Sequence, residues 1–222
     1  MIKCNVTICG VVSKAATCRN DKDGKPFVTF AVNVVIPAKN GIRSATSGDA
    51  CQSKNKTIEV SVTKDGTLTD VPVIELGARI ELAGMLTLKK RGDNLYFNLA
   101  ATGINAATLA NEDSITGQME FRGKTGKQIE EKKDKKGRPF IAFNAFSAEK
   151  VQDGFEYTWV RFIRFDHERE AWLQPSMKIS AKGNLELSVY NDRLNISCRF
   201  DEISEYTPMP FQPSRPTDTI PF

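Results

Sequence analysis

Histidine is almost absent from this chain, which has a single one, His167, among 222 residues. A Ser-His or Cys-His catalytic pair would have to use that residue, and a histidine-rich metal site is excluded. Asp166 and Glu168 flank His167, but no nucleophile motif accompanies the three residues. We therefore expect no enzyme, no cofactor and no bound metal.

Paired cysteines and long apolar runs are also missing. The five cysteines include no Cys-x-x-Cys pair, so neither a disulfide framework nor a standard zinc knuckle is indicated. A nonstandard zinc site built from Cys4, Cys9, Cys18 and Cys51 is left as a minor alternative. Because no run of about 18 apolar residues occurs and the start lacks a signal-peptide pattern, we expect a cytoplasmic protein with no membrane span.

The charge that is present is mildly basic and unevenly placed. The whole chain has 31 Lys and Arg against 27 Asp and Glu, a net charge of +4. Residues 1–110 hold 14 basic and 9 acidic side chains, whereas residues 111–222 hold 17 and 18. This imbalance indicates an anionic partner and puts the excess positive charge in the first half.

Apolar and polar residues alternate with a period of two through much of the chain, as in residues 28–34, 58–62 and 80–82. Such alternation is typical of half-buried β-strands. Helical patterns are short and cover only about 67–76 and 168–173, and Trp172 in the second is expected to be a core residue. Many short strands with one small helix per copy predict small β-barrels.

Four sequence echoes in the same order predict two copies of one domain. They pair residues 8–10 with 115–117, 21–27 with 134–140, 80–86 with 179–185, and 93–95 with 192–194. Each copy has the element order of an OB barrel: strand, basic loop, two strands, short helix, strand, hairpin, strand. We predict an all-β fold with short helices, made of two tandem OB-fold barrels at 1–106 and 114–206 and a flexible proline-rich tail at 207–222.

Three stretches resemble the bacterial single-stranded DNA-binding protein family. Residues 6–12 and 115–119 resemble its opening strand, apolar-x-apolar-x-Gly. Residues 157–165 resemble its third strand, with a Trp, a basic residue and a Phe at Trp159, Arg161 and Phe165. Residues 218–222 resemble its acidic tip ending in Ile-Pro-Phe, although Asp218 is the only acid there.

This resemblance implies a protein that coats single-stranded DNA in DNA replication, repair and recombination. It implies a homodimer, because the family's working unit has four OB domains. It also implies that the tip recruits replication and repair proteins through Asp218, Ile220, Pro221 and Phe222. The missing acids weaken the expected docking of this tip.

Sequence-independent binding of a single strand needs cations for the phosphates and flat side chains for the bases. Alternation places Trp159, Arg161 and Phe165 on the strand face opposite Val160 and Phe162. If Val160 and Phe162 line the barrel, the aromatic face is turned outward; the inverted assignment would bury Trp159 and Phe165. We adopt the outward assignment, which adds Phe140 and Phe146 from the neighbouring strand.

The expected cations lie in two loops, one in each copy. In copy two they are Lys132, Lys133, Lys135, Lys136 and Arg138. In copy one the candidate cations are Lys89, Lys90 and Arg91, and the candidate aromatic residues of that copy are Tyr96 and Phe27. The third strand of copy one, residues 57–63, has no aromatic residue, so we expect copy one to supply charge and dimer contacts and copy two to supply stacking.

Two other functions remain open from the sequence. A primosome-type or RNA-binding OB protein would use the same surfaces, and comparing single-stranded DNA, RNA and duplex would separate it. A protein-interaction scaffold with solvated basic loops would bind no single-stranded DNA even at low salt.

Overall fold

The computed structural model describes residues 1–38, 54–152 and 154–207. Within these ranges the regular structure is almost entirely β-strand, and the strands are β1 (Ile2–Asn20), β2 (Pro26–Ile36), β3 (Lys56–Asp65), β4 (Arg79–Arg91), β5 (Asn94–Asn105), β6 (Ser114–Lys133), β7 (Pro139–Val151), β8 (Gly154–Phe165), β9 (Lys178–Tyr190) and β10 (Arg193–Glu205). The 3-10 turn η1 (Leu68–Asp70) is the one helical element there. In the same ranges no helix is long and apolar enough to cross a membrane.

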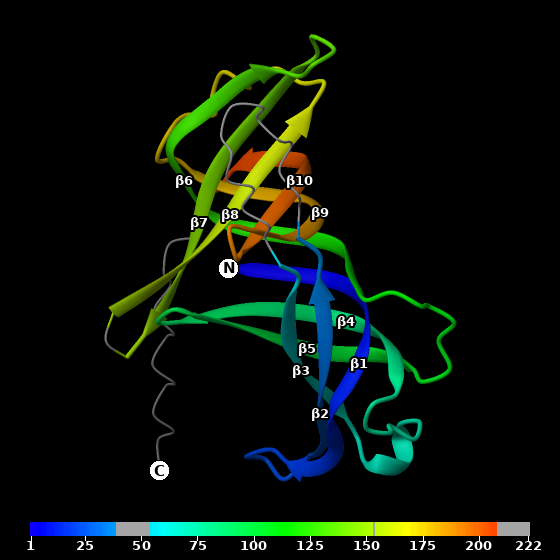
Figure 1. The fold of residues 1–222 in the computed structure, drawn as a ribbon. Helices are drawn as coiled ribbons and strands as arrows, with labels where there is room; N and C mark the ends of the chain where they lie inside the picture. Colours follow the sequence, from blue (N-terminus) through cyan, green and yellow to red (C-terminus); the bar gives the residue numbers. More distant parts are fainter. Residues whose placement is uncertain (39–53, 153, 208–222) are drawn as a thin grey trace, which may run out of the picture.

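Strands β1 to β5 close into one barrel and β6 to β10 into a second (Figure 1). In the first, β1 pairs antiparallel with β2 and β4, and β3 joins β2 antiparallel and β5 parallel. The second barrel repeats these pairings. This confirms the predicted all-β fold of two tandem OB barrels. The domain boundaries stay a prediction.

Three of the four sequence repeats are confirmed. The fourth, which matched residues 8–10 with residues 115–117 in the first strand of each copy, is wrong. Gly10 and Gly123 occupy the same place, because a Cβ on either would collide with the carbonyl oxygen of the neighbouring strand, at Asn33 or Phe146. The offset is therefore 113 and not 107, and Gly117 is not the counterpart of Gly10. The sequence misled because the motif of an apolar residue two before a glycine occurs twice in β6.

The two barrels are joined through their first strands. β1 and β6 pair antiparallel from Ile2 opposite Phe121 to Cys9 opposite Ser114, and Figure 1 shows them side by side at the middle of the molecule. With the offset of 113, Asn5 pairs with Gln118, its own counterpart in the other copy. An approximate two-fold axis therefore passes between these two residues.

Both predicted helices are wrong. In 67–76 only Leu68–Asp70 is helical, because Pro72 lacks an N–H donor and disfavours a helical residue before it. The Asp70 carboxylate instead accepts the Thr67 N–H at 2.7 Å and closes a single turn. Residues 168–173 form no helix, with only Ala171 and Trp172 in a turn, because six residues are too few to offset the cost of nucleating a helix. Trp172 nevertheless packs against the core, as predicted.

The two cores differ in composition. The first barrel is filled mainly by aliphatic side chains such as Val32, Val60 and Leu82, which are fully buried. The second is built around a cluster of aromatic rings, in which Phe162 lies 4.9 Å from Phe121 and 5.2 Å from Phe143 between ring centroids. This cluster fixes the inner face of β8 and so determines which residues β8 presents outward.

Candidate nucleic-acid interface

The outer face of β8 is lined with exposed aromatic side chains. Val160 and Phe162 are 1% and 0% exposed, whereas Trp159 and Phe165 are 52% and 44% exposed. The outward assignment of β8 is therefore right and the inverted one is wrong. The same alternation exposes two more aromatics that the sequence reasoning missed, Tyr157 and Phe155. We call Phe155, Tyr157, Trp159, Arg161 and Phe165 the aromatic face.

Phe140 and Phe146 of β7 lie half-buried beside this face. Phe146 pairs with Trp159 across the strands, with ring centroids 5.0 Å apart, and Phe140 pairs with Phe165 at 5.6 Å. Between these pairs lies Arg161, opposite Asn144. Ala142, which lies on the same face of β7 as Phe140 and Phe146, is buried, because its small side chain lies below its larger neighbours on the sheet.

Each of the two aromatic pairs continues across the sheet to a lysine of β6. Lys132 is the register partner of Phe140, and Lys124 is the register partner of Phe146. Residues in register share one face of a sheet, so a cation, a half-buried ring and an exposed ring lie in a row. Lys124 was missed by the sequence reasoning because its partner depends on a bulge in β6 between Thr125 and Ile129.

A groove of about 630 Å³ runs between β8 and the β9–β10 hairpin. Trp159 and Arg161 line one side, and Tyr190 and Asn195 line the other. Tyr190, the last residue of β9, is 54% exposed. The turn after it contains Asn191 and Asp192, which both have positive φ. A tyrosine beside such a turn is a usable sequence signal, and it was not used. The groove combines flat rings with one guanidinium and two amides, those of Asn144 and Asn195.

The basic loop between β6 and β7 is shaped by Asp134. Its Oδ1 accepts the N–H groups of Lys136 at 2.8 Å and Arg138 at 2.9 Å, and Asp21 holds the β1–β2 loop in the same way. The Arg138 N–H bond is the main cause that lowers the pKa of Asp134. The loop therefore keeps its shape while its lysines point into solvent.

The predicted cations of this loop are not equally available. The Arg138 guanidinium is held by Asp134 at 2.8 Å and Asp166 at 3.3 Å, and Lys132 pairs with Glu130 at 2.7 Å. In the described part of the chain, three of these predicted lysines form no ion pair: Lys133 at the end of β6, and Lys135 and Lys136 in the loop.

Copy one lacks the aromatic face at the equivalent positions. The β2–β3 and β7–β8 registers align Trp159 with Glu59 and Phe165 with Asp65. Glu59 is exposed and pairs with Lys14 at 2.7 Å. Acidic side chains at these positions repel phosphate and offer no stacking surface. Phe27, the counterpart of Phe140, is half-buried and pairs with Asp65 in place of a second ring.

The copy-one hairpin residues lie away from the groove. Lys89 and the exposed Tyr96 are register partners near the β4–β5 turn, and Lys90 is half-buried. Arg91 is engaged with Glu149 of β7 at 3.2 Å between Nη1 and Oε2. The structure therefore brings the copy-two candidates together and leaves these four on a separate surface.

The remaining predictions concern the C-terminal tip, the cysteines and a metal site. The tip residues Asp218, Ile220, Pro221 and Phe222, and Cys51, lie outside the described residues. Among the described residues no group of three His, Cys, Asp or Glu side chains is arranged to hold a metal ion. Burial raises the pKa of the Cys4 and Cys198 thiols to about 12, so both stay protonated at neutral pH.

No protein-family model and no curated protein sequence matches this chain. Among solved structures the chain is similar to the wild-type single-stranded DNA binding protein from Thermus aquaticus, at 13% identity and a TM-score of 0.44, covering 96% of this chain and 97% of that chain. A deletion mutant of the same protein gives 12% identity and a TM-score of 0.42, with 98% of both chains covered. One chain of a Replication Protein A heterotrimer bound to ssDNA gives 12% identity and a TM-score of 0.29, over 87% of this chain and 49% of that chain.

Proposed function

We propose that this protein binds single-stranded DNA without sequence preference, through the aromatic face and the adjoining groove of copy two. The observation that carries the proposal is the row of exposed rings on β8. Large exposed aromatic side chains in contiguous positions are costly unless a ligand covers them. Bases of any sequence have a flat surface, so stacking on such rings is sequence-tolerant.

The cations complete the site. The free lysines of the basic loop, Arg161 and Lys124 flank the rings and would contact the phosphates. Copy one adds net positive charge that attracts the strand over a longer range. We keep Lys89, Lys90 and Arg91 as proposed contributors to this longer-range attraction, and we keep the uncharged Tyr96 and Phe27 as proposed binding residues of copy one.

The proposal is tested by titrating tryptophan fluorescence with oligo-dT at two salt concentrations. We expect quenching, because Trp159 stacks on a base. With about four phosphate contacts, binding should weaken by about 50-fold between about 50 and about 200 mM salt. A matched RNA and a matched duplex serve as comparisons. Stronger binding to RNA would favour the RNA-binding alternative, and no binding at low salt would favour the protein-interaction scaffold.

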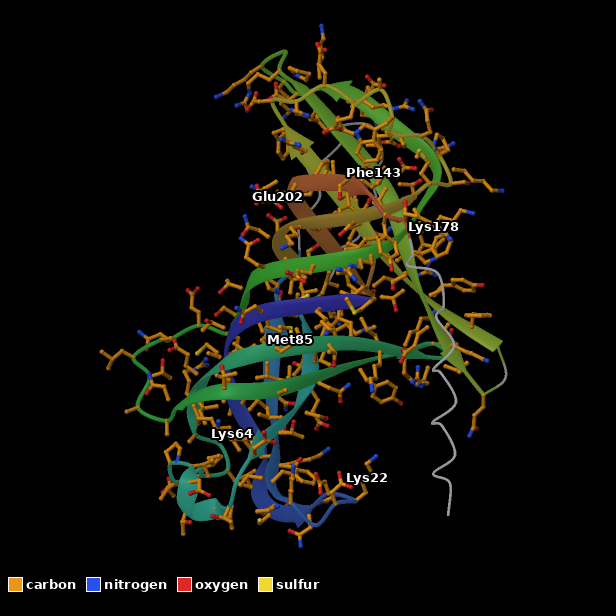
Figure 2. The ribbon with its side chains drawn as sticks, turned by 180° about the vertical axis from the view of Figure 1, so that it is seen from behind. Lys22, Lys64, Met85, Phe143, Lys178 and Glu202 are labelled. Carbon is orange, nitrogen blue, oxygen red and sulfur yellow. The ribbon has the colours of Figure 1, made fainter. Side chains whose placement is uncertain are left out.

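We further propose that the chain forms a homodimer. The interface would be the broad outer face of β5, β4, β1, β6 and β9, which are successive neighbours where the two barrels join. Its outward residues on copy one include the small or apolar Ala83, Ala100 and Met85, which is 38% exposed, beside polar residues such as Asn5 and Thr87. Figure 2 shows Met85 on β4, close to the junction of β1 and β6 between the two barrels. Such a face suits a second copy better than solvent.

Sedimentation should give a mass about twice the 24.6 kDa of one chain. We expect Met85→Arg to shift the protein toward monomer, because a charge would be buried in the interface. Val73→Arg, at an exposed apolar residue outside this face, is the control and should leave the mass unchanged. A monomeric unaltered protein at tens of micromolar would contradict the homodimer.

The C-terminal tip keeps the role that the resemblance implied. We propose that Ile220, Pro221 and Phe222 form a short peptide ligand, with Asp218 and the terminal carboxylate pairing with basic residues of replication and repair proteins.

A further inference from the structure

The outer part of the β7–β8 hairpin, residues 147–152 with 154–158, is a two-stranded ribbon; we call it the arm. The pairing of β7 with β6 ends at Phe146, and the pairing of β8 with β10 begins at Arg161. Beyond these points the two strands pair only with each other in the described structure. A ribbon of two strands is marginally stable on its own. The arm nevertheless carries Phe155 and Tyr157 of the aromatic face.

Copy one supports the opposite side of the arm. Glu149 and Glu156 are register partners, and alternation turns both away from the aromatic face. The turn of the β4–β5 hairpin contacts both: Arg91 Nη1 lies 3.2 Å from Glu149 Oε2, and the Gly92 N–H donates to Glu156 Oε1 at 3.0 Å. One hairpin turn of copy one thus holds one residue of each strand of the arm.

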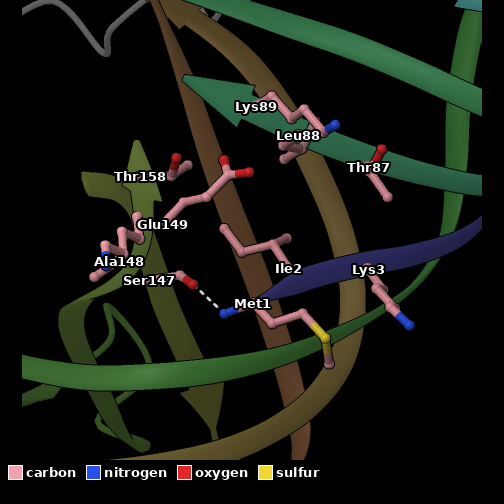
Figure 3. A pocket seen from close by; sticks show the side chains of 11 residues that line it. Met1, Ile2, Lys3, Thr87, Leu88, Lys89, Ser147, Ala148, Glu149 and Thr158 are labelled. Carbon is pink, nitrogen blue, oxygen red and sulfur yellow. Dashed lines mark hydrogen bonds between the residues drawn. The ribbon is translucent and has the colours of Figure 1, made fainter. Parts of the chain in front are cut away.

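The contact leaves space beneath the arm. A cavity of about 370 Å³ separates the arm from β1 and β4. Figure 3 shows Ser147, Glu149 and Thr158 on one side and Thr87, Leu88 and Lys89 on the other. At the base of the arm the Ser147 hydroxyl accepts a hydrogen bond from the Met1 nitrogen. The arm therefore bridges a cavity and is anchored at its base and midway along its length.

The same arrangement recurs across the two-fold axis. The β9–β10 hairpin of copy two, which corresponds to the β4–β5 hairpin at an offset of 99, contacts both ends of the β2–β3 connection of copy one. The Val189 N–H donates to the Pro37 carbonyl at 3.3 Å, and the Lys54 N–H donates to Asp192 Oδ1 at 3.5 Å. Because each barrel holds the other in this way, the contact is a regular feature of the fold.

We propose that the β4–β5 hairpin of copy one is a clasp that holds the arm in its binding position, with Arg91, Gly92, Glu149 and Glu156 as positioning residues. This inference rests on the proposed function, because the arm carries part of the proposed DNA surface. Holding the arm in place beforehand removes the entropic cost of ordering it when the strand binds. Copy one thereby strengthens binding through a contact with the arm that does not itself involve the DNA.

The clasp is tested by whether a double variant raises or lowers the affinity for oligo-dT. The double variant Glu149→Ala and Glu156→Ala removes two negative charges beside the DNA surface. If these are ordinary surface charges, affinity for oligo-dT rises. If they form the clasp, affinity falls by about threefold, the amount expected from two exposed polar contacts. The control variant Glu75→Ala and Glu205→Ala removes the same charge elsewhere on the surface and should not lower affinity.

Amide hydrogen exchange gives a second readout that needs no DNA. In the double variant we expect faster exchange in residues 147–158 and unchanged exchange in β6 and β10. Unchanged exchange in the arm, or affinity equal to or above that of the control variant, would overturn the clasp. If the unaltered protein fails to bind oligo-dT, the proposed function is wrong, and the exchange of the arm alone decides whether the clasp exists.

Discussion

Replacing Trp159 with alanine is expected to weaken oligo-dT binding by about fivefold to 150-fold. The indole is 52% exposed at the groove, beside Phe146, and makes no hydrogen bond in the described structure. Loss of one stacked base corresponds to about 1–3 kcal/mol. Because about half of the removed side chain is exposed to solvent, the free energy of unfolding should change much less than on emptying a buried site. Fluorescence anisotropy of a labelled oligo-dT measures the affinity, and denaturant titration measures the stability.

Two variants in copy one provide the controls for this result. Glu59→Ala alters the position equivalent to Trp159, and affinity should stay the same or rise slightly as an acid is lost. Tyr96→Ala removes an exposed ring outside the groove and should cost far less than Trp159→Ala. If Tyr96→Ala abolished binding while Trp159→Ala left it unchanged, the division of roles between the copies would be wrong.

Phe162→Ala is expected to destabilise the protein by about 3–5 kcal/mol, the usual cost of emptying a buried phenylalanine site. Phe162 is fully buried, and its ring contacts those of Phe121, Phe143 and Phe200 at 4.9, 5.2 and 6.2 Å between centroids. The strand carrying the aromatic face would lose its fixed position as the core relaxes. Denaturant unfolding followed by circular dichroism gives the change in free energy.

Phe165→Ala is the matched control for Phe162→Ala, because it removes the same side chain from the outer face of the same strand. Phe165 is 44% exposed, with its ring 5.6 Å from that of Phe140. We expect a cost in stability below about 1 kcal/mol and a clear loss of oligo-dT affinity. Equal destabilisation by the two variants would mean that the faces of β8 are not functionally distinct.

The aromatic face could be predicted from sequence because strand alternation is a local property. Once Val160 and Phe162 were assigned to the core, Trp159 and Phe165 had to face outward. Tyr157 and Phe155 follow from the same rule and were missed only because the pattern was not extended toward the start of the strand. The turn geometry of the basic loop was also accessible, since Asp134 and Gly137 repeat Asp21 and Gly24.

The parts that failed depend on contacts between distant residues. The counterpart of Gly10 is defined by the carbonyl of the neighbouring strand, and two glycines of β6 fit the local motif equally well. Arg91 was predicted as a free cation, but its partner Glu149 lies 58 residues along the chain and is brought close by the pairing of β1 with β6. No local periodicity encodes such a pairing.

The two-fold axis between Asn5 and Gln118 relates two barrels of nearly the same backbone and very different surface. In a pair of identical barrels, a ligand with two different ends could lie across the axis in either direction with equal energy. Here Glu59 and Asp65 stand where the other barrel has Trp159 and Phe165. The two directions across the axis are therefore inequivalent: a strand bound as proposed would meet the aromatic face of copy two on one side of the axis and the acidic positions of copy one on the other.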